Sequence, residues 1–89
     1  MNNIKFIADC MLGKLARWLR ILGFDTQYVR YLTDAQLLAQ ARYQNRILLT
    51  KDTLLYKKAK NLGYFVHSET IEEQVKEILH HFQLHPLLA

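Results

Sequence analysis

Residues 6–25 read FIADCMLGKLARWLRILGFD. A short apolar run ends on Asp9, a tight turn follows, and a helical pattern then extends to Gly23. We expect a strand, a turn and a helix, with the glycine just beyond the helix end, where a left-handed backbone is common. In open parallel sheets, ligands collect beyond the carboxyl ends of the strands. Asp9 is therefore placed for chemistry.

The predicted helix after Asp9 has an apolar side and a cationic side. The apolar side is a stripe of leucines at helical spacing, Leu12, Leu15, Leu19 and Leu22. We expect this stripe to face the sheet. The opposite side carries cations three residues apart, Lys14, Arg17 and Arg20. These cations are either a solvated helix face or a surface that binds phosphate, with Lys14 and Arg17 as the candidate residues.

The length of the chain, 89 residues, fits one domain. We place this domain at residues 1–83, followed by a short tail at residues 84–89. Hydrophobic residues make up 51% of the chain, which excludes disorder. A domain of this size buries only about 60–65% of its unfolded surface. A homodimer would bury more, and Trp18 or the last helix could supply the contact.

The net charge and the cysteine content indicate which kind of partner the protein binds and in which cellular compartment it lies. Twelve Lys and Arg residues against eight Asp and Glu residues give a net charge of +4, which favours an anionic partner such as RNA. One cysteine excludes an internal disulfide and fits a reducing cytoplasm. We interpret this residue, Cys10, as a small buried hydrophobic side chain. No apolar run approaches the ~20 residues of a membrane span.

The rest of the chain alternates strand patterns with helix patterns. We expect strands at residues 5–8, 26–29, 46–50 and 64–67, and helices at residues 13–22, 33–43, 53–62 and 70–82. Two helices open with capping boxes, formed by Thr33 with Gln36 and by Thr70 with Glu73. The order predicts an α/β fold, a three-layer α/β/α sandwich around a four-stranded, mainly parallel sheet.

Three acids lie next to predicted strands or helices at the carboxyl edge of the sheet. Asp9 follows the first strand, Asp52 follows the third, and Asp34 opens the second helix. If the first and third strands are neighbours, these carboxylates form a cluster whose repulsion a hard cation such as Mg²⁺ or Mn²⁺ relieves. Such an ion can polarise a phosphodiester. The alternative is that Asp34 and Asp52 only cap helices, as Asp25 is interpreted as a turn residue.

Two further residues precede Asp52. The hydroxyl of Thr50 could hold a carboxylate or a metal-bound water, and Lys51 could meet a phosphate. A second group of basic residues follows with one aromatic neighbour, namely Tyr56, Lys57, Lys58 and Lys60. This group is either a solvated face or an extension of a nucleic-acid track.

Two stretches together closely resemble a known family. They are FIADCMLGKLARWLRILGFDT at residues 6–26 and RILLTKD at residues 46–52, and they are similar to the Mut-seven C-terminal RNase domain family, a branch of the PIN-like nucleases. The resemblance implies a PIN-like fold over nearly the whole chain. It also implies metal-dependent RNA cleavage that leaves a 5′-phosphate and a 3′-hydroxyl. By position, it implies Asp9, Asp34 and Asp52 as the catalytic and metal-binding acids.

The sequence departs from that family pattern in two places. Family members often carry further acids after the position of Asp34, where this chain has Ala35 and Gln36. Many members also continue into a cysteine-rich zinc ribbon, but this sequence has no cysteine after Cys10. We therefore keep an alternative, an RNA- or protein-binding module on the same fold with too few metal ligands for turnover.

Overall fold

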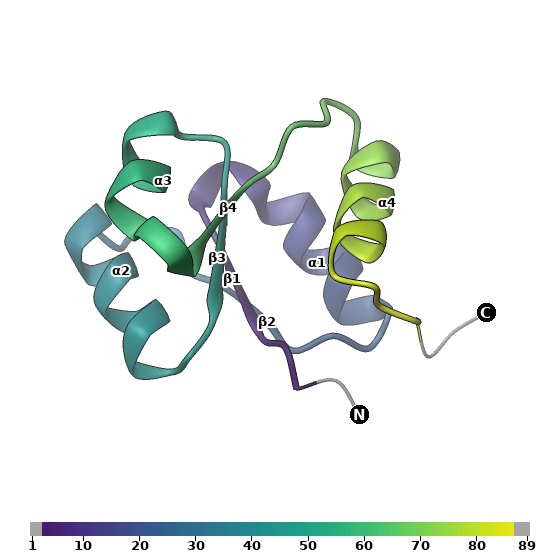
Figure 1. Cartoon of the computed structure of the whole chain (residues 1–89), viewed down its shortest axis with the longest axis horizontal. Helices are drawn as coiled ribbons and strands as arrows, with labels where there is room; N and C mark the ends of the chain where they lie inside the picture. The colour runs from purple at the N-terminus through teal and green to yellow at the C-terminus, as the bar shows by residue number, and fades with distance from the viewer. Residues whose placement is uncertain (1–2, 87–89) are drawn as a thin grey trace.

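The protein forms three layers in a computed structural model that describes residues 3–86 (Figure 1). The middle layer is a sheet of four parallel strands, β1 (Phe6–Ala8), β2 (Thr26–Tyr28), β3 (Ile47–Thr50) and β4 (Gly63–Phe65). The outer layers are α1 (Gly13–Ile21) with α4 (Ile71–His81), and α2 (Asp34–Tyr43) with α3 (Thr53–Ala59). Two short 3₁₀ turns complete the described chain, η1 (Cys10–Leu12) and η2 (Lys60–Leu62). The predicted α/β sandwich is confirmed, and its sheet is parallel throughout.

The strand order β2-β1-β3-β4 places a switch point in the middle of the sheet. Ala8 of β1 lies opposite Tyr28 of β2 on one side and opposite Leu49 of β3 on the other. The chain passes from β1 to β2 through α1 and from β2 to β3 through α2, on opposite faces of the sheet (Figure 1). Ligands of such sheets bind at the carboxyl ends of the two strands that flank this reversal. Here those two strands are β1 and β3.

The two central strands are buried on both faces, as their apolar runs predicted. Phe6 and Ala8 pack into the core beside α1 and α4, whereas Ile7 packs into the core beside α2 and α3. Leu49 and Leu48 divide between the same two cores. This alternation is the two-residue period of a strand, and it divides the side chains of each central strand between the two cores.

The predicted helix ends are confirmed where a local cap defines them. Thr33 accepts the N–H of Gln36 at 3.1 Å, and the Gln36 side chain accepts the N–H of Thr33 at 2.9 Å, which is a complete capping box. Thr70 accepts the N–H of Glu73 at 3.2 Å, but the Glu73 carboxylate accepts from the Thr70 hydroxyl instead of the backbone. Gly23 has a φ of 100°, the left-handed conformation expected at that position.

The end of α3 differs from our prediction. We expected a helix to residue 62 with Gly63 as its stop, but α3 ends at Ala59, η2 follows, and Gly63 is the first residue of β4. A Cβ atom at Gly63 would lie 2.9 Å from the Cβ of Ala59 and 3.3 Å from the Tyr56 ring. The glycine is therefore needed because α3 packs directly against β4.

The core extends beyond the last helix. Leu84 is 6% exposed and packs with the α1 and α4 core, and its N–H donates to the carbonyl of Leu79 at 2.9 Å. The predicted tail at residues 84–89 thus begins with a packed residue, and residues 87–89 lie outside the described part. Trp18 is 47% exposed and lines an apolar groove with Pro86. The homodimer that this surface suggested stays a prediction.

Candidate functional site

Asp9 lies at the carboxyl end of β1 and is held there by β3, its neighbour in the sheet. Its N–H donates to the carbonyl of Leu49 at 2.9 Å, which extends the pairing of β1 with β3 by one residue. Its Oδ1 accepts the N–H of Cys10 at 2.6 Å, and its Oδ2 accepts the hydroxyl of Thr50 at 2.9 Å. The residue is 8% exposed, and its carboxylate keeps accepting capacity beyond these two bonds.

Thr50 joins Asp9 to Asp52. The hydroxyl of Thr50 donates to Asp9 and accepts the N–H of Asp52 at 2.9 Å, and the residue is fully buried. Of the two partners that we considered for this hydroxyl, a carboxylate and a metal-bound water, the structure shows the carboxylate of Asp9. This one hydroxyl acts as donor and acceptor, and it therefore fixes the carboxyl ends of β1 and β3 relative to each other. A substrate-binding role for Thr50 stays a prediction.

Asp52 is exposed and is the N-cap residue directly before α3. Its Oδ1 accepts the N–H groups of Leu54 and Leu55 at 2.9 and 3.1 Å, so the residue is the helix cap that the alternative interpretation predicted. Its Oδ2 has no hydrogen-bond partner within residues 3–86. Capping and ligand binding are compatible here, because they use different oxygens of the same carboxylate.

The expected cluster of three acids is not formed. Asp34 is the first residue of α2, and its Oδ2 lies 3.9 Å from the Nζ of Lys58 on α3, with both side chains at least half exposed. No group of three or more His, Cys, Asp or Glu side chains that could hold a metal ion exists between residues 3 and 86. Asp34 instead lies beside a cation of the neighbouring helix, and its role as a catalytic or metal-binding acid stays a prediction.

Lys51 ties a loop to the end of β3. Its ammonium donates to the carbonyls of Val66 and Ser68 at 3.1 and 3.0 Å and lies 3.5 Å from a carboxylate oxygen of Glu69. An ammonium has three donors, and these three acceptors engage it on the loop between β4 and α4. The phosphate contact that we predicted for Lys51 stays a prediction and requires these bonds to exchange.

Lys14 and Arg17 are exposed on α1, on the side opposite its buried leucines. Lys14 lines a shallow hollow together with Glu69 and Gln74, next to the turn that follows Asp9. Neither cation forms an ion pair with any residue from 3 to 86. Their phosphate-binding role stays a prediction, and both ammonium and guanidinium groups face solvent.

Glu77, which the sequence analysis missed, anchors the loop above the site. Its carboxylate accepts the Tyr64 hydroxyl at 2.5 Å and the N–H groups of His67 and Ser68 at 3.0 and 2.9 Å. Burial raises the pKa of Glu77, but these hydrogen bonds outweigh it and lower the pKa to about 2. Burial and the Glu77 carboxylate raise the pKa of the Tyr64 hydroxyl well above its ordinary value. A glutamate inside an amphipathic helix gave no local signal of this contact.

Cys10 is exposed, not buried as we predicted, because η1 turns its side chain out of the core. Desolvation, the negative charge of Asp9 and a hydrogen bond to Asp9 raise the pKa of the Cys10 thiol above its ordinary value. The thiol is therefore protonated at neutral pH.

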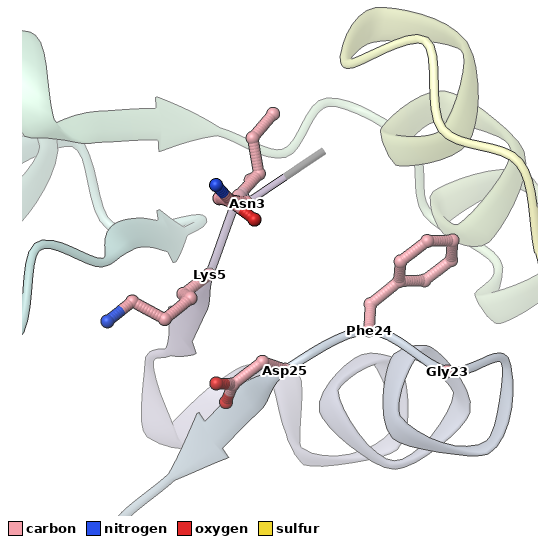
Figure 2. Close-up of a pocket in the computed structure, with 6 residues that line it drawn as sticks. Asn3, Lys5, Gly23, Phe24 and Asp25 are labelled. Atoms are coloured by element: carbon pink, nitrogen blue, oxygen red, sulfur yellow. The ribbon is translucent and has the colours of Figure 1, made fainter. Parts of the chain in front are cut away.

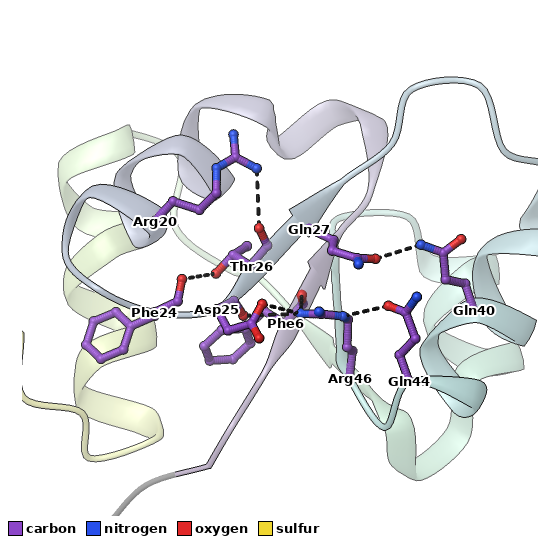
Figure 3. A network of polar contacts seen from close by, with 9 residues as sticks. All are labelled: Phe6, Arg20, Phe24, Asp25, Thr26, Gln27, Gln40, Gln44 and Arg46. Atoms are coloured by element: carbon purple, nitrogen blue, oxygen red, sulfur yellow. Dashed lines mark hydrogen bonds and ion pairs between the residues drawn. The ribbon is translucent and has the colours of Figure 1, made fainter.

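A second polar cluster lies at the opposite, amino-terminal edge of the sheet (Figure 3). Arg46 is 8% exposed and donates through Nη1 to Asp25 Oδ1 at 2.8 Å and to the carbonyl of Phe6 at 3.1 Å. Its Nε donates to the side chain of Gln44 at 2.8 Å. We predicted Arg46 only as a strand residue and Asp25 only as a turn residue, but together they hold the start of β1 and β2.

A pocket opens at that same amino-terminal edge (Figure 2). Lys5, Phe24 and Asp25 are among the residues that line it. The carboxylate of Asp25 is engaged by Arg46, and the pocket lies at the other ends of the strands from Asp9 and Asp52. We therefore place the candidate site at the carboxyl edge.

The fold is a small parallel α/β sandwich, and Asp9 and Asp52 directly follow β1 and β3, the two strands that flank its topological switch point. The chain belongs to the Mut7-C RNAse domain family, whose family model matches residues 4–89. The resemblance seen in the sequence is thereby confirmed. Comparisons with curated proteins and with solved structures found no match. No helix within residues 3–86 is long and apolar enough to cross a membrane.

Proposed function

We propose that this domain hydrolyses RNA phosphodiester bonds at the carboxyl edge of its sheet. The observation that carries the proposal is the Thr50 hydroxyl, which joins the ends of β1 and β3 so that Asp9 and Asp52 are held at the switch point. The family supports the ribonuclease class. The products expected from the family resemblance are a 5′-phosphate and a 3′-hydroxyl. We also propose a cytoplasmic location, which suits a chain with a single cysteine.

The donor chemistry of the site fits Mg²⁺ or Mn²⁺. Mg²⁺ is usually bound through one or two carboxylates, with waters and substrate phosphates as its other ligands. Asp9 and Asp52 would hold the ion, since each has carboxylate oxygens with accepting capacity left. When bound, such an ion polarises the phosphodiester and acidifies a water. Asp34 is the third predicted acid. If Asp34→Asn abolishes RNA cleavage, the site uses three acids, and if cleavage is retained, the site uses two.

The protein's own groups around the acids have separate roles in this proposal. Thr50 orients Asp9 through its hydrogen bond, and the cap of α3 orients Asp52. Lys14 and Arg17, exposed and without ion pairs among residues 3–86, bind the phosphates that flank the scissile bond. Binding should therefore weaken as the salt concentration rises, because phosphate contacts release counterions.

Cleavage of a labelled single-stranded RNA tests the proposal. We expect cleavage with Mn²⁺, none with EDTA, and none with Asp9→Asn or Asp52→Asn. Glu72→Gln, an exposed acid on α4, is the matched control and should cleave normally. Cleavage that survives in both Asp9→Asn and Asp52→Asn, as a contaminant's would, contradicts the proposed site.

One observation favours a second candidate, a binding module without turnover. Residues 3–86 contain no group of three metal-binding side chains. A nuclease should gain thermal stability from millimolar Mn²⁺ and lose that gain in Asp9→Asn. A binding module should be indifferent to the metal but sensitive to salt when it binds RNA.

A further inference from the structure

A pocket of about 540 Å³ opens along β4, next to the proposed site. Its lining begins at Thr53, the residue directly after Asp52. The other lining residues are Gly63, one lysine and five rings, namely Lys57, Tyr56, Tyr64, Phe65, His67 and His81. The volume lies within the range of about 300–1,000 Å³ that is typical of ligand pockets. β4 is the outer strand of the sheet, so no further strand from residues 3–86 pairs with its free edge.

The rings of this β4 pocket are held in place by one another. The ring centroids of Tyr56 and Phe65 are 5.9 Å apart at an interplanar angle of 73°, and those of Phe65 and His67 are 5.2 Å apart at 54°. The backbone of His67 is fixed in turn by its hydrogen bond to Glu77. Tyr56 remains 40% exposed and His67 is exposed, so a planar ligand can reach ring surfaces whose positions are already set.

Two exposed lysines lie at the β4 pocket, and the nearby Glu77 carboxylate is engaged by the Tyr64 hydroxyl and by backbone N–H groups. Lys57 lines the pocket, Lys60 is exposed on the turn that follows, and no Asp or Glu is among the lining residues. Neither lysine forms an ion pair within the described chain. Aromatic surfaces beside lysines are the combination that single-stranded nucleic acids bind, with bases stacked on the rings and phosphates near the cations.

We propose that the β4 pocket receives an unpaired base of single-stranded RNA while the adjoining phosphate lies at Asp9 and Asp52. The proposal rests on the proposed function, since it names the form of RNA that the site takes. A base in a duplex is already stacked and paired, and it cannot enter the pocket without being unstacked. Stacking on Phe65 involves no hydrogen bond, so the pocket should accept different bases.

Binding measured without cleavage tests the pocket by itself. In Asp9→Asn protein, the dissociation constant of a labelled oligouridylate of about eight nucleotides, a length within known site sizes, is read by fluorescence anisotropy. Phe65→Leu and His67→Ala should each raise it about fivefold or more, which corresponds to the lower end of stacking energies. Tyr43→Leu, an exposed tyrosine on α2, is the matched control and should change nothing. A duplex of matched length should bind at least several-fold more weakly.

Each outcome decides either the pocket or the nuclease proposal. If Phe65→Leu unfolds the protein, His67→Ala and the backbone NMR shifts of residues 53–67 on adding the oligouridylate decide the question. Equal affinity of His67→Ala and Tyr43→Leu, shifts confined elsewhere, or no RNA binding at all would overturn the pocket. Pocket-dependent binding without cleavage in the wild type keeps this inference and rejects the nuclease. RNA cleavage whose KM for single-stranded RNA is unchanged in Phe65→Leu and His67→Ala keeps the nuclease proposal and rejects the pocket.

Discussion

The hydroxyl of Thr50 donates a hydrogen bond of 2.9 Å to the carboxylate of Asp9, across 41 residues of chain. The same oxygen accepts the N–H of Asp52 at 2.9 Å. One buried side chain thus joins the two strand ends that carry the candidate acids. Its substitution should affect both the fold and the site.

Thr50→Val removes this hydroxyl while keeping the shape of the side chain. It leaves the N–H of Asp52 and one oxygen of Asp9 without a partner, so we expect a loss of about 1–3 kcal/mol in the free energy of unfolding. Urea denaturation measures this loss. Thr50→Ser, which keeps a hydroxyl, should retain most of the stability and the RNA cleavage. A Val variant as stable as the wild type would mean that the hydrogen bond to Asp9 contributes nothing.

Two substitutions at Asp52 separate its cap from its charge. Asp52→Ala removes the acceptor of the Leu54 and Leu55 N–H groups and should cost about 0.5–2 kcal/mol of stability, as lost helix caps do. Asp52→Asn keeps a capping oxygen and should cost less. Both variants should lose RNA cleavage, measured on the same labelled RNA at a temperature where each is folded. An active Asn variant would make Asp52 a cap alone.

Acid should weaken the protein through Glu77. The pKa of this carboxyl is about 2 in the folded protein, against an ordinary value of 4.5. Because the folded pKa is the lower one, the stabilisation is fully present above about pH 4.5 and is lost as the pH falls toward 2. Glu77→Gln should remove this part of the pH dependence. Urea unfolding between pH 2 and 5 tests it, and Glu72→Gln should leave the curve unchanged.

Gly63→Ala should push α3 away from β4. The added Cβ would lie 2.9 Å from the Cβ of Ala59, and overpacking of this kind typically costs about 1–3 kcal/mol. Ala59→Gly removes the opposing Cβ but weakens the helix by itself. We therefore expect the double variant to be more stable than the sum of the two single losses predicts. Strict additivity in a double-mutant cycle would show that the two positions do not contact.

Arg46→Ala should destabilise the fold without altering the site. The guanidinium donates to Asp25 and to the carbonyl of Phe6, and hydrogen bonds to charged groups contribute about 1.5–3 kcal/mol each. Asp25→Asn should cost less, because that side chain is 57% exposed. RNA cleavage per folded molecule should equal that of the wild type, since this network lies at the amino-terminal edge. A cleavage defect in folded Arg46→Ala protein would argue against placing the site at the carboxyl edge alone.

Short-range patterns were sufficient to predict most of the fold. The Thr33 capping box, the left-handed Gly23 and the apolar run before Thr50 each depend on residues a few positions apart. The position of Asp9 and Asp52 just after β1 and β3 also followed from the order of strands and helices. These features are set by backbone hydrogen bonding and side-chain periodicity, which near neighbours in the chain determine.

Long-range packing determined the side-chain partners, and the sequence did not reveal them. Asp34 lies beside Lys58 on the neighbouring helix, and Glu77 holds Tyr64 from 13 residues away in the chain. The ring pocket on β4 likewise exists only because α3 packs against that strand at Gly63. Such contacts depend on the distance and angle between packed elements, and neither propensity nor spacing specifies them. The sequence thus determined that Asp9 and Asp52 lie at the carboxyl edge of the sheet. Packing between the layers determined which side chains contact each other.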